Sequence, residues 1–346
     1  MGMRDEILEQ PAVAARVLER ARPTVEVVAA EVRRRRPPFA VIAARGTSDH
    51  AAIYAQYALG VRCGLPVALA APSIVSLYRA TPRYADGLII GVSQSGASPD
   101  VVGVVELGRA EGAITVAVTN DPRSPLAVAA EHVIDLAAGP ERAVAATKTY
   151  TAELTALAML TAAIRDGNTG EEAGLAGIPQ ALATASATEP DVARIAADQV
   201  AVDRCIVLGR GFQYATAREW ALKLKELAYV LADPYSAADF LHGPLALVNP
   251  EIPVLAVAPS GATAQDGSAL LTRLRDGHGA RLVVISDVAE LRALGTWAVA
   301  LPAGLPEWLL PIVAIVPGQL HAYHLTRAKG LDPETPRHLR KVTMTR

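Results

Sequence analysis

The sequence contains little cysteine and almost no net charge. Among its 346 residues there are 2 cysteines, Cys63 and Cys205, which lie far apart and have no C-x-x-C or histidine-rich context. We therefore expect neither a disulfide framework nor a metal site. The 33 basic and 35 acidic residues leave a formal net charge of −2. Because proteins that bind nucleic acid usually carry a basic excess, we expect no nucleic-acid partner.

Long hydrophobic runs and targeting signals are also missing. The longest apolar run, from Trp308 to Val316, is interrupted by Pro311 and is too short to cross a bilayer. The N-terminal residues MGMRDEILEQP are polar and lack the apolar core of a signal peptide. The sequence therefore predicts a cytoplasmic protein with no membrane partner.

What the sequence does contain is a large apolar fraction, much of it alanine and valine. Hydrophobic residues account for 51% of the chain, whereas aromatic residues account for only 4%. This balance suits helices packed over a buried parallel sheet. Strand-like runs alternate with helical patterns, which is typical of βαβ units. These runs cover residues 40–43, 88–92, 114–118, 205–208, 253–257 and 282–285.

The turns that follow these strands recur at a constant spacing. Arg45-Gly46 and Arg210-Gly211 follow the first and fourth strands and are 165 residues apart. Ser95-Gly96-Ala97 and Ser260-Gly261-Ala262 follow the second and fifth strands at the same offset. The sequence therefore predicts an α/β fold with two tandem doubly wound parallel-sheet αβα domains. We place an N-terminal helical segment, the first domain, a helical linker, the second domain and a C-terminal tail at residues 1–38, 39–168, 169–199, 200–330 and 331–346.

Two loops of the first half are rich in hydroxyl side chains and follow predicted strands, where doubly wound sheets bind ligands. Arg45-Gly46-Thr47-Ser48 follows the first strand, and the segment from Ser93 to Asp100 follows the second. Hydroxyls and backbone N–H groups at the start of a helix suit a phosphate group. Neither loop matches the G-x-G-x-x-G or P-loop pattern, so we expect no nicotinamide or ATP cofactor.

An alternative explanation is that these polar residues only cap a helix. Ser98 or Asp100 can serve as the cap before Val101, but capping accounts for one or two polar residues rather than for the whole loop. The equivalent loop of the second half, from Ala258 to Ala262, offers fewer donors, and Pro259 has no N–H. We therefore expect a single phosphate site.

The second half contains charged residues suited to proton transfer. Residues 216–231 predict a helix in which Glu219, Lys223 and Glu226 are spaced as ion pairs. Taken alone, this spacing favours a solvated helix face. His242, however, precedes a Gly-Pro turn that favours an exposed ring, and a carboxylate and a histidine at one pocket suffice for proton transfer. The apolar face of the helix is predicted to comprise Trp220, Leu224, Leu227 and Leu231.

Six motifs stand out, in chain order, at Arg45–Ser48, Ser93–Gly96, Val144–Lys148, Ala221–Glu226, His242–Leu245 and Pro336–Leu339. Together they resemble the sugar isomerase (SIS) family. Within it they look most like the isomerase region of glucosamine-6-phosphate synthase and the stand-alone glucosamine-6-phosphate deaminases of SIS type. The resemblance covers nearly the whole chain. It implies a cofactor-free enzyme that binds a sugar phosphate and works as a homodimer with a shared active site.

The resemblance also implies roles for individual residues. Glu226 would move the proton between C1 and C2, Lys223 would orient or polarise the open-chain sugar, and His242 would assist ring opening from the neighbouring subunit. Lys341 aligns with the lysine that forms a Schiff base in the synthase, although the arginines around it also suit a solvated basic tail. The implied phosphate-binding residues are Ser93, Gln94, Ser95, Ser98, Thr47 and Ser48, and the implied sugar-pocket residues are Gly46, Glu141, Val144 and Ala146.

The sequence differs from the synthase pattern at several positions that concern the substrate and the reaction. Arg45 stands where the synthase has a cysteine, Ala146 replaces the usual serine, and Ser98-Pro99-Asp100 looks more like the stand-alone deaminases. The synthase also has an N-terminal glutamine-hydrolysing domain with a terminal cysteine nucleophile, whereas this sequence begins Met-Gly-Met. We therefore expect no glutamine-dependent synthesis.

The function expected from these residues is that of a glucosamine-6-phosphate deaminase, which converts glucosamine 6-phosphate and water to fructose 6-phosphate and ammonia. One alternative is a deglycase or isomerase acting on another amino- or N-substituted sugar phosphate. Another is a non-catalytic regulator that binds a sugar phosphate, although residues 1–38 are too few for the helix-turn-helix domain that such regulators usually carry.

Overall fold

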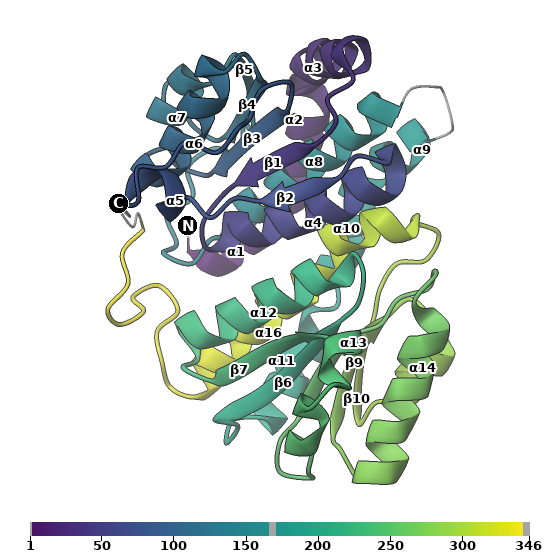
Figure 1. The fold of residues 1–346 in the computed structure, drawn as a ribbon. Coiled ribbons are helices and arrows are strands. Elements are labelled where there is room, and N and C mark those ends of the chain that lie inside the picture. The colour runs from purple at the N-terminus through teal and green to yellow at the C-terminus, as the bar shows by residue number, and fades with distance from the viewer. Residues whose placement is uncertain (1, 166–170, 342–346) are drawn as a thin grey trace. The chain divides into compact units, whose positions relative to one another are not determined.

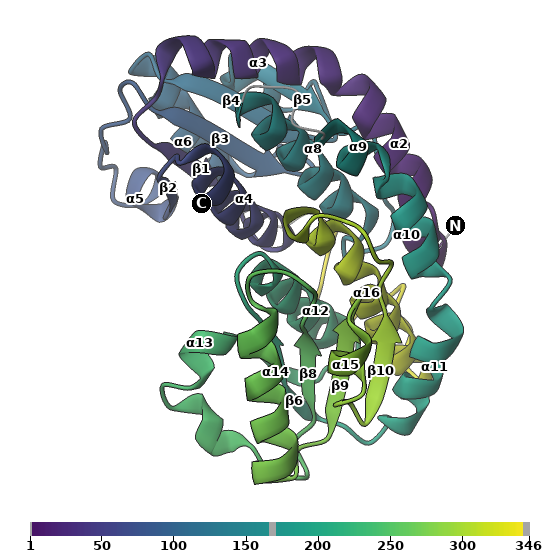
Figure 2. The ribbon, with the colours of Figure 1, turned by 90° about the vertical axis from the view of Figure 1, so that its right-hand side faces the viewer.

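The computed structural model describes residues 2–165 and 171–341. These residues form two compact units, each built around one parallel sheet (Figures 1 and 2). We call them the first-sheet unit and the second-sheet unit. Within the described ranges, the first-sheet unit comprises residues 12–141, 148–165, 171–176 and 340–341, and the second-sheet unit comprises residues 2–11, 142–147 and 177–339. The domain boundaries expected from the sequence stay a prediction.

The two sheets have the same strand order. The strands of the first-sheet unit are β1 (Ala40–Ala43), β2 (Val67–Leu69), β3 (Leu88–Ser93), β4 (Ile114–Thr119) and β5 (His132–Asp135). Those of the second-sheet unit are β6 (Arg204–Gly209), β7 (Leu231–Ser236), β8 (Val254–Val257), β9 (Leu282–Ser286) and β10 (Trp297–Ala300). The orders are β2-β1-β3-β4-β5 and β10-β9-β8-β6-β7, so each unit reads 2-1-3-4-5 when its own strands are numbered. The predicted pair of doubly wound α/β units is confirmed.

Helices cover both faces of the first sheet (Figure 2). One layer contains α3, α4 and α8, which pack on one another, and the other contains α5, α6 and α7. The helices up to this point of the chain are α1 (Met3–Leu8), α2 (Gln10–Arg20), α3 (Arg22–Arg35), α4 (Thr47–Cys63), α5 (Ser73–Ser76), α6 (Pro99–Ala110), α7 (Pro125–Ala129), α8 (Lys148–Arg165) and α9 (Glu171–Ala176).

The second sheet is covered in the same way. On one face α12 and α16 pack together against the strands, and on the other α13 and α14 contribute Phe240, Leu270 and Leu271 to an apolar cluster with β6, β8 and β9. The helices of this part are α10 (Ile178–Ser186), α11 (Glu189–Asp198), α12 (Gln213–Leu227), α13 (Ala237–Phe240), η1 (Pro244–Leu247), α14 (Ala264–Thr272), η2 (Arg273–Gly277), α15 (Ala289–Arg292), η3 (Glu307–Leu309) and α16 (Leu310–Ala328).

The six strands predicted from the sequence are the inner strands of the two sheets, and the four that it missed are the edge strands. Every residue of β1, β3, β4, β8 and β9 is buried, because helices cover both faces of these strands. The edge strands β5, β7 and β10 each have one buried residue among more exposed ones, and β2 has none, so these strands do not show as buried apolar runs. β7 also contains Pro234, which is tolerated at a sheet edge.

The helix predicted over residues 216–231 is α12, but its predicted end is wrong. The helix stops at Leu227, and Tyr229 adopts a positive φ of 55° in the turn that leads into β7. Leu231 is the first residue of β7 and is 76% exposed, so it does not belong to the apolar face. Trp220, Leu224 and Leu227 are buried as predicted.

The apolar run from Trp308 to Val316 forms η3 and the first half of α16, and it is buried in the second-sheet unit. Its neighbours are α10, α11 and α12, which pack along α16. Throughout the described part of the chain, no helix combines the length and the apolar character needed to cross a membrane.

Candidate active site

The predicted phosphate loop lies where the strand order of the first sheet reverses. β1 stands between β2 and β3, so the chain leaves β1 toward one side of the sheet and β3 toward the other. Doubly wound sheets bind ligands in the crevice outside the carboxyl ends of such strands. Two loops begin at this point, residues 44–46 after β1 and residues 94–98 after β3, and they lead into α4 and α6. Five of the six predicted phosphate-binding residues follow these strands or begin these helices, and Ser93 ends β3.

The loop after β3 is held tight by its own hydroxyl groups. The Ser93 hydroxyl accepts a hydrogen bond from the Gly96 N–H at 3.1 Å, and the Ser95 hydroxyl accepts one from the Ala97 N–H at 3.3 Å. Gly96 has a φ of 60°, and a Cβ on it would lie 2.1 Å from the Ser124 Oγ. A residue with a side chain therefore cannot replace Gly96 without moving the loop.

Ser98 occupies the N-cap position of α6, whereas Asp100 is the second residue of the helix rather than its cap. Ser98 is the residue before α6, yet among the described residues its side chain makes no capping hydrogen bond. Asp100 accepts the N–H of Val101 in the first helical turn at 3.0 Å. The Ser98 hydroxyl is thus left at the positive end of a 12-residue helix, where anions are stabilised.

An ion pair joins the loop after β1 to the start of α6. The Arg45 Nε and Nη2 lie 2.8 Å and 2.7 Å from the Asp100 Oδ2. The Asp100 side chain is 0% exposed and that of Arg45 is 44% exposed. No local sequence pattern pairs these residues, which are separated by 55 positions.

Ser48 turns its hydroxyl inward. It donates a hydrogen bond to the Glu153 Oε1 of α8 at 2.8 Å, and both side chains are buried. This contact fastens α4 to α8. Ser48 therefore has a packing role in the structure that its predicted phosphate-binding role did not include. Thr47, the first residue of α4, is half-buried, as is Gln94 in the other loop.

Lys341 and Glu141, both predicted site residues, are in contact. The Lys341 Nζ lies 2.8 Å from the Glu141 Oε2, and the other carboxylate oxygen accepts the N–H of Thr149 in the first turn of α8 at 3.1 Å. The Glu141 side chain is 0% exposed and that of Lys341 is 24% exposed. The alternative of a solvated basic tail is therefore wrong for Lys341, although its neighbour Arg340 is exposed. The tail residue Arg346, considered above with it, lies outside the described residues.

In the second-sheet unit, α12 carries a buried row of three charges. The Lys223 Nζ lies 3.3 Å from the Glu219 Oε1 and 2.6 Å from the Glu226 Oε2. Glu219 and Lys223 are 0% exposed, so the expectation of a solvated face is wrong for them, whereas Glu226 is 23% exposed. Burial alone would lower the pKa of Lys223, but the two carboxylates outweigh it and raise that pKa well above its usual value. Lys223 is thus a fixed cation beside Glu226.

His242 and the remaining predicted residues are open to solvent to different degrees. His242 is exposed in the turn between α13 and η1, where its N–H donates to the Asp239 carbonyl at 3.0 Å. Val144 and Ala146, of the second-sheet unit, are half-buried. Gly46, which precedes α4, is exposed.

Comparison with known proteins identifies the family of this chain. The family model for the SIS domain matches residues 37–163 and 200–325. The chain belongs to the SIS domain family. A curated relative, the isomerizing glutamine–fructose-6-phosphate aminotransferase of Gloeobacter violaceus, is 36% identical over 312 residues, which cover 87% of this chain and 51% of the relative. The chain thus spans about half the length of the curated relatives it matches.

Two solved structures have the same two-unit SIS architecture. One is a candidate phosphosugar isomerase from Silicibacter pomeroyi DSS-3, with a TM-score of 0.84 and 36% identity over 96% of this chain and 99% of that one. The other is the C-terminal domain of glucosamine-fructose-6-phosphate aminotransferase from Francisella tularensis, with a TM-score of 0.87 and 26% identity over 96% of this chain and 98% of that one.

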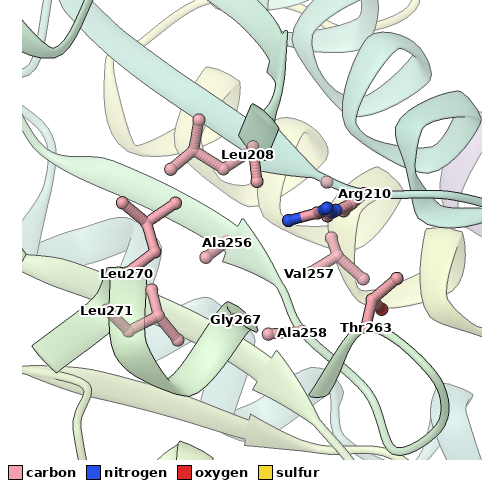
Figure 3. A pocket seen from close by; sticks show the side chains of 11 residues that line it. Leu208, Arg210, Ala256, Val257, Ala258, Thr263, Gly267, Leu270 and Leu271 are labelled. Atoms are coloured by element: carbon pink, nitrogen blue, oxygen red, sulfur yellow. The ribbon is translucent and has the colours of Figure 1, made fainter. Parts of the chain in front are cut away.

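The second SIS repeat has its own point of strand reversal, between β6 and β8. The loop that follows β8, however, is already bound by carboxylates of the chain itself. The Ser260 N–H and hydroxyl donate to the two carboxylate oxygens of Asp287, at 2.7 Å and 2.5 Å. The Ala262 N–H donates to the Glu307 Oε2 at 2.8 Å. The pocket beside this loop has Arg210 at one end and leucines at the other (Figure 3). Carboxylates of the chain thus fill the place that an anion would take.

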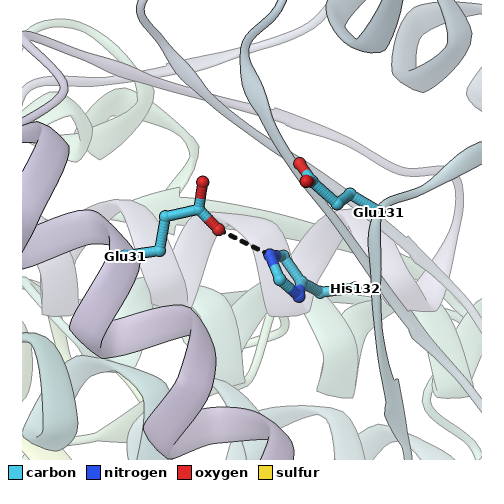
Figure 4. Close-up of side chains that lie close together, drawn as sticks. All are labelled: Glu31, Glu131 and His132. Carbon is cyan, nitrogen blue, oxygen red and sulfur yellow. Dashed lines mark hydrogen bonds and ion pairs between the residues drawn. The ribbon is translucent and has the colours of Figure 1, made fainter.

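One cluster in the first SIS repeat has the residue types of a metal site. Glu31 of α3, Glu131, and His132 of β5 offer ligand atoms that lie within 4.8 Å of one another (Figure 4). The Glu31 carboxylate is already hydrogen-bonded to the His132 Nε2 at 2.8 Å and to the Arg35 Nη1 at 3.3 Å. Burial raises the pKa of Glu31, but these hydrogen bonds outweigh it and lower the pKa below its usual value. Glu31 and His132 are therefore already engaged in an ion-pair network.

Sequence reasoning missed the buried partners of the site residues. Asp100 holds Arg45, Glu153 holds Ser48, and Glu219 holds Lys223. The i, i+4 spacing signalled the Glu219–Lys223 contact but not its burial. The other two pairs join residues on different elements, so no local pattern indicates them.

Proposed function

We propose that this protein is a glucosamine-6-phosphate deaminase that isomerises its substrate by proton transfer between C1 and C2. The observation that carries the proposal is the buried Glu219–Lys223–Glu226 row, in which a fixed cation lies 2.6 Å from a partly exposed carboxylate. The names of the similar proteins, a fructose-6-phosphate aminotransferase and a candidate phosphosugar isomerase, support a phosphorylated hexose as substrate.

Glu226 is the proposed base. In the open-chain sugar, the C2 proton is acidic because it is adjacent to the C1 carbonyl. Glu226 removes that proton from C2 and returns it to C1, and Lys223 supports the negative charge that develops on the carbonyl oxygen. The product is a C2 imine, which water hydrolyses to the ketone of fructose 6-phosphate with release of ammonia. A positioned base of this kind contributes roughly 10²–10⁴-fold to the rate.

The phosphate end is assigned to the loop from Ser93 to Ser98. Its hydroxyl groups and the start of α6 favour a dianion, and Gly96 allows the backbone to approach it closely. Thr47 and Ser48, at the start of α4, add a second helix N-terminus. Gly46, Glu141, Val144 and Ala146 are assigned to the sugar pocket.

Lys341 and His242 are assigned to the steps around the proton transfer. Lys341 can form a Schiff base only as a free amine, so its proton must first leave the ion pair with Glu141. His242 is exposed in the single chain, which supports a role in ring opening for a neighbouring subunit of a homodimer.

The two cysteines are poor candidates for the nucleophile of a glutamine hydrolysis. Burial raises the pKa of Cys63 to about 11 and that of Cys205 to about 12. A thiol with so high a pKa is a poor nucleophile at neutral pH, because only the thiolate attacks.

A second candidate function is a deglycase or isomerase that acts on another amino- or N-substituted sugar phosphate. It is favoured by Arg45 and Ala146, two positions at which the sequence departs from the synthase pattern. A panel of glucosamine, galactosamine and fructosamine phosphates distinguishes the two functions.

The direct test is detection of fructose 6-phosphate by a coupled assay with purified protein and millimolar glucosamine 6-phosphate. In deuterium oxide, the product should carry deuterium at C1 because Glu226 exchanges its proton with solvent. Glu226→Gln should lose roughly 10²–10⁴-fold in kcat. Lys225→Met, an exposed lysine of the same helix, is the matched control. Wild-type protein that binds the sugar and releases neither product would contradict the proposal.

A further inference from the structure

Both points of strand reversal carry an arginine paired with an aspartate, at matching places in the two repeats. Arg45 follows β1 and pairs with Asp100 in the first turn of α6, and Arg210 follows β6 and pairs with Asp266 in the first turn of α14. The closest atoms of the two pairs are each 2.7 Å apart. The pair is therefore a repeated feature of the fold, and the two copies can be compared within one molecule.

The two copies differ in what surrounds the arginine. Near Arg210, the loop N–H groups are taken by Asp287 and Glu307, and Asp266 is 59% exposed. In the first repeat Asp121 follows β4 as Asp287 follows β9, but Asp121 accepts the N–H of Arg123 at 3.0 Å. The loop beside Arg45 is thus lined by hydroxyl groups rather than by carboxylates.

The ion pair with Asp100 holds the Arg45 guanidinium in place but does not engage all of its N–H donors. Both of its contacts with Asp100 go to a single oxygen, through Nε and Nη2. A guanidinium has five N–H donors, so further donors remain on a side chain that is 44% exposed. Asp100 lies two positions after Ser98, so the ion pair holds the Arg45 guanidinium next to the end of the Ser93–Ser98 loop.

We propose that Arg45 binds the phosphate group of the substrate and that Asp100 is the positioning residue that fixes its guanidinium. The proposal rests on the proposed function and deepens it. An arginine held in this way loses little freedom when it binds, and its planar fork matches the oxygens of a phosphate. Arg45 thereby makes the site selective for phosphorylated over free amino sugars. Arg210 has no such role, because Asp287 and Glu307 already bind the N–H groups of the loop in its repeat.

The test measures binding and turnover in three forms of the full chain. One is wild type, the second is Arg45→Met/Asp100→Asn, and the third is Arg210→Met/Asp266→Asn as the matched control. Both members of each pair are changed so that no buried carboxylate is left unpaired. Calorimetry uses glucosamine 6-phosphate, inorganic phosphate and unphosphorylated glucosamine as probes, and melting temperatures verify folding.

Arg45→Met/Asp100→Asn should bind glucosamine 6-phosphate and inorganic phosphate about 10- to 100-fold more weakly than wild type. A loss of this size is typical of a charge-assisted hydrogen bond. The KM of this variant should rise by a similar factor while kcat changes little, because the contact is made equally in the ground and transition states. Affinity for glucosamine should not change. Arg210→Met/Asp266→Asn should behave as wild type.

Three results would overturn the inference or its basis. A folded Arg45→Met/Asp100→Asn protein with wild-type affinity for the phosphorylated sugar would overturn the role of Arg45. Equal losses in the Arg210 control would also overturn it, since the effect would then not be local to the first repeat. A wild-type protein that binds neither glucosamine 6-phosphate nor inorganic phosphate would overturn both proposals. Phosphate binding through Arg45 without turnover would support this inference and contradict only the proposed deaminase activity.

Discussion

The ammonium of Lys341 is hydrogen-bonded to the buried carboxylate of Glu141 at 2.8 Å, although the two residues are 200 positions apart in the chain. Glu141 also accepts the N–H of Thr149 at the start of α8. A single carboxylate therefore fastens the last described residue of the tail to the first-sheet unit.

Glu141→Gln should loosen this tail. Glutamine can still accept the Thr149 N–H, but it offers no negative charge to Lys341, so the tail should be cut by trypsin after Arg340 and Lys341 several-fold faster. Mass spectrometry of a limited digest measures the two rates. Glu334→Gln, whose carboxylate accepts the N–H of Met3, is the control and should leave these rates unchanged. Equal protection of the tail in both variants would show that the ion pair does not hold it.

Lys223→Met should destabilise the second-sheet unit strongly. It would leave Glu219 buried without its cation, and breaking a buried ion pair in this way typically costs about 3–5 kcal/mol. Lys225→Met, on the exposed side of α12, should change the free energy of unfolding by less than about 0.5 kcal/mol. Urea unfolding of both variants provides the comparison. Adding Glu219→Gln to Lys223→Met should recover part of the loss, and a double variant less stable than the single one would refute this account.

A shared active site predicts that two inactive variants complement each other. Glu226→Gln and His242→Asn are co-expressed with different tags, and the mixed dimer is purified through both. If His242 serves the neighbouring subunit, one site of the mixed dimer is intact, and the activity should be about half that of wild type. If His242 serves its own subunit, neither site is intact and the mixed dimer is inactive.

His321 should make the protein less stable in mild acid. It is buried in α16, where its Nδ1 accepts the Trp220 Nε1–H at 3.2 Å and its Nε2 lies 2.8 Å from the Gln199 Oε1. Burial lowers its pKa to about 3 from a usual value of 6.5. Between these values the unfolded chain binds a proton that the folded chain does not, so stability falls as the pH decreases through this window.

The measurement is the free energy of unfolding as a function of pH for wild type and His321→Asn. The variant should be less stable than wild type at pH 7, but its slope between about pH 6 and 4 should be shallower by up to about 1.4 kcal/mol per pH unit. Parallel curves for wild type and His321→Asn would contradict the assignment.

The inner parts of the fold could be predicted from the sequence because burial on both faces leaves a continuous apolar run. Ile90 and Val116 belong to such runs, whereas the edge strand β7, with Pro234 and an exposed Leu231, does not. The end of α12 was missed for a related reason. Leu231 continues the helical spacing of apolar residues, but the chain leaves the helix at Tyr229 to begin the edge strand.

The candidate site was predictable where its chemistry is local. The Ser93–Ser98 loop and the spacing of Glu219, Lys223 and Glu226 are visible in the sequence, because each occupies one loop or one helix. Burial of Glu219 and Lys223 was not, since it depends on how α12 packs against other elements of the fold. The Arg45–Asp100 and Lys341–Glu141 contacts depend on how separate elements come together.

The filled loop of the second repeat has a consequence for ligand stoichiometry. Asp287 and Glu307 are tethered beside Ser260 and Ala262, so their effective concentration there far exceeds that of any dissolved anion. A free phosphate would have to displace two carboxylates that never diffuse away. The duplicated fold therefore does not give a duplicated ligand response, and titration with a sugar phosphate should saturate at one equivalent per chain.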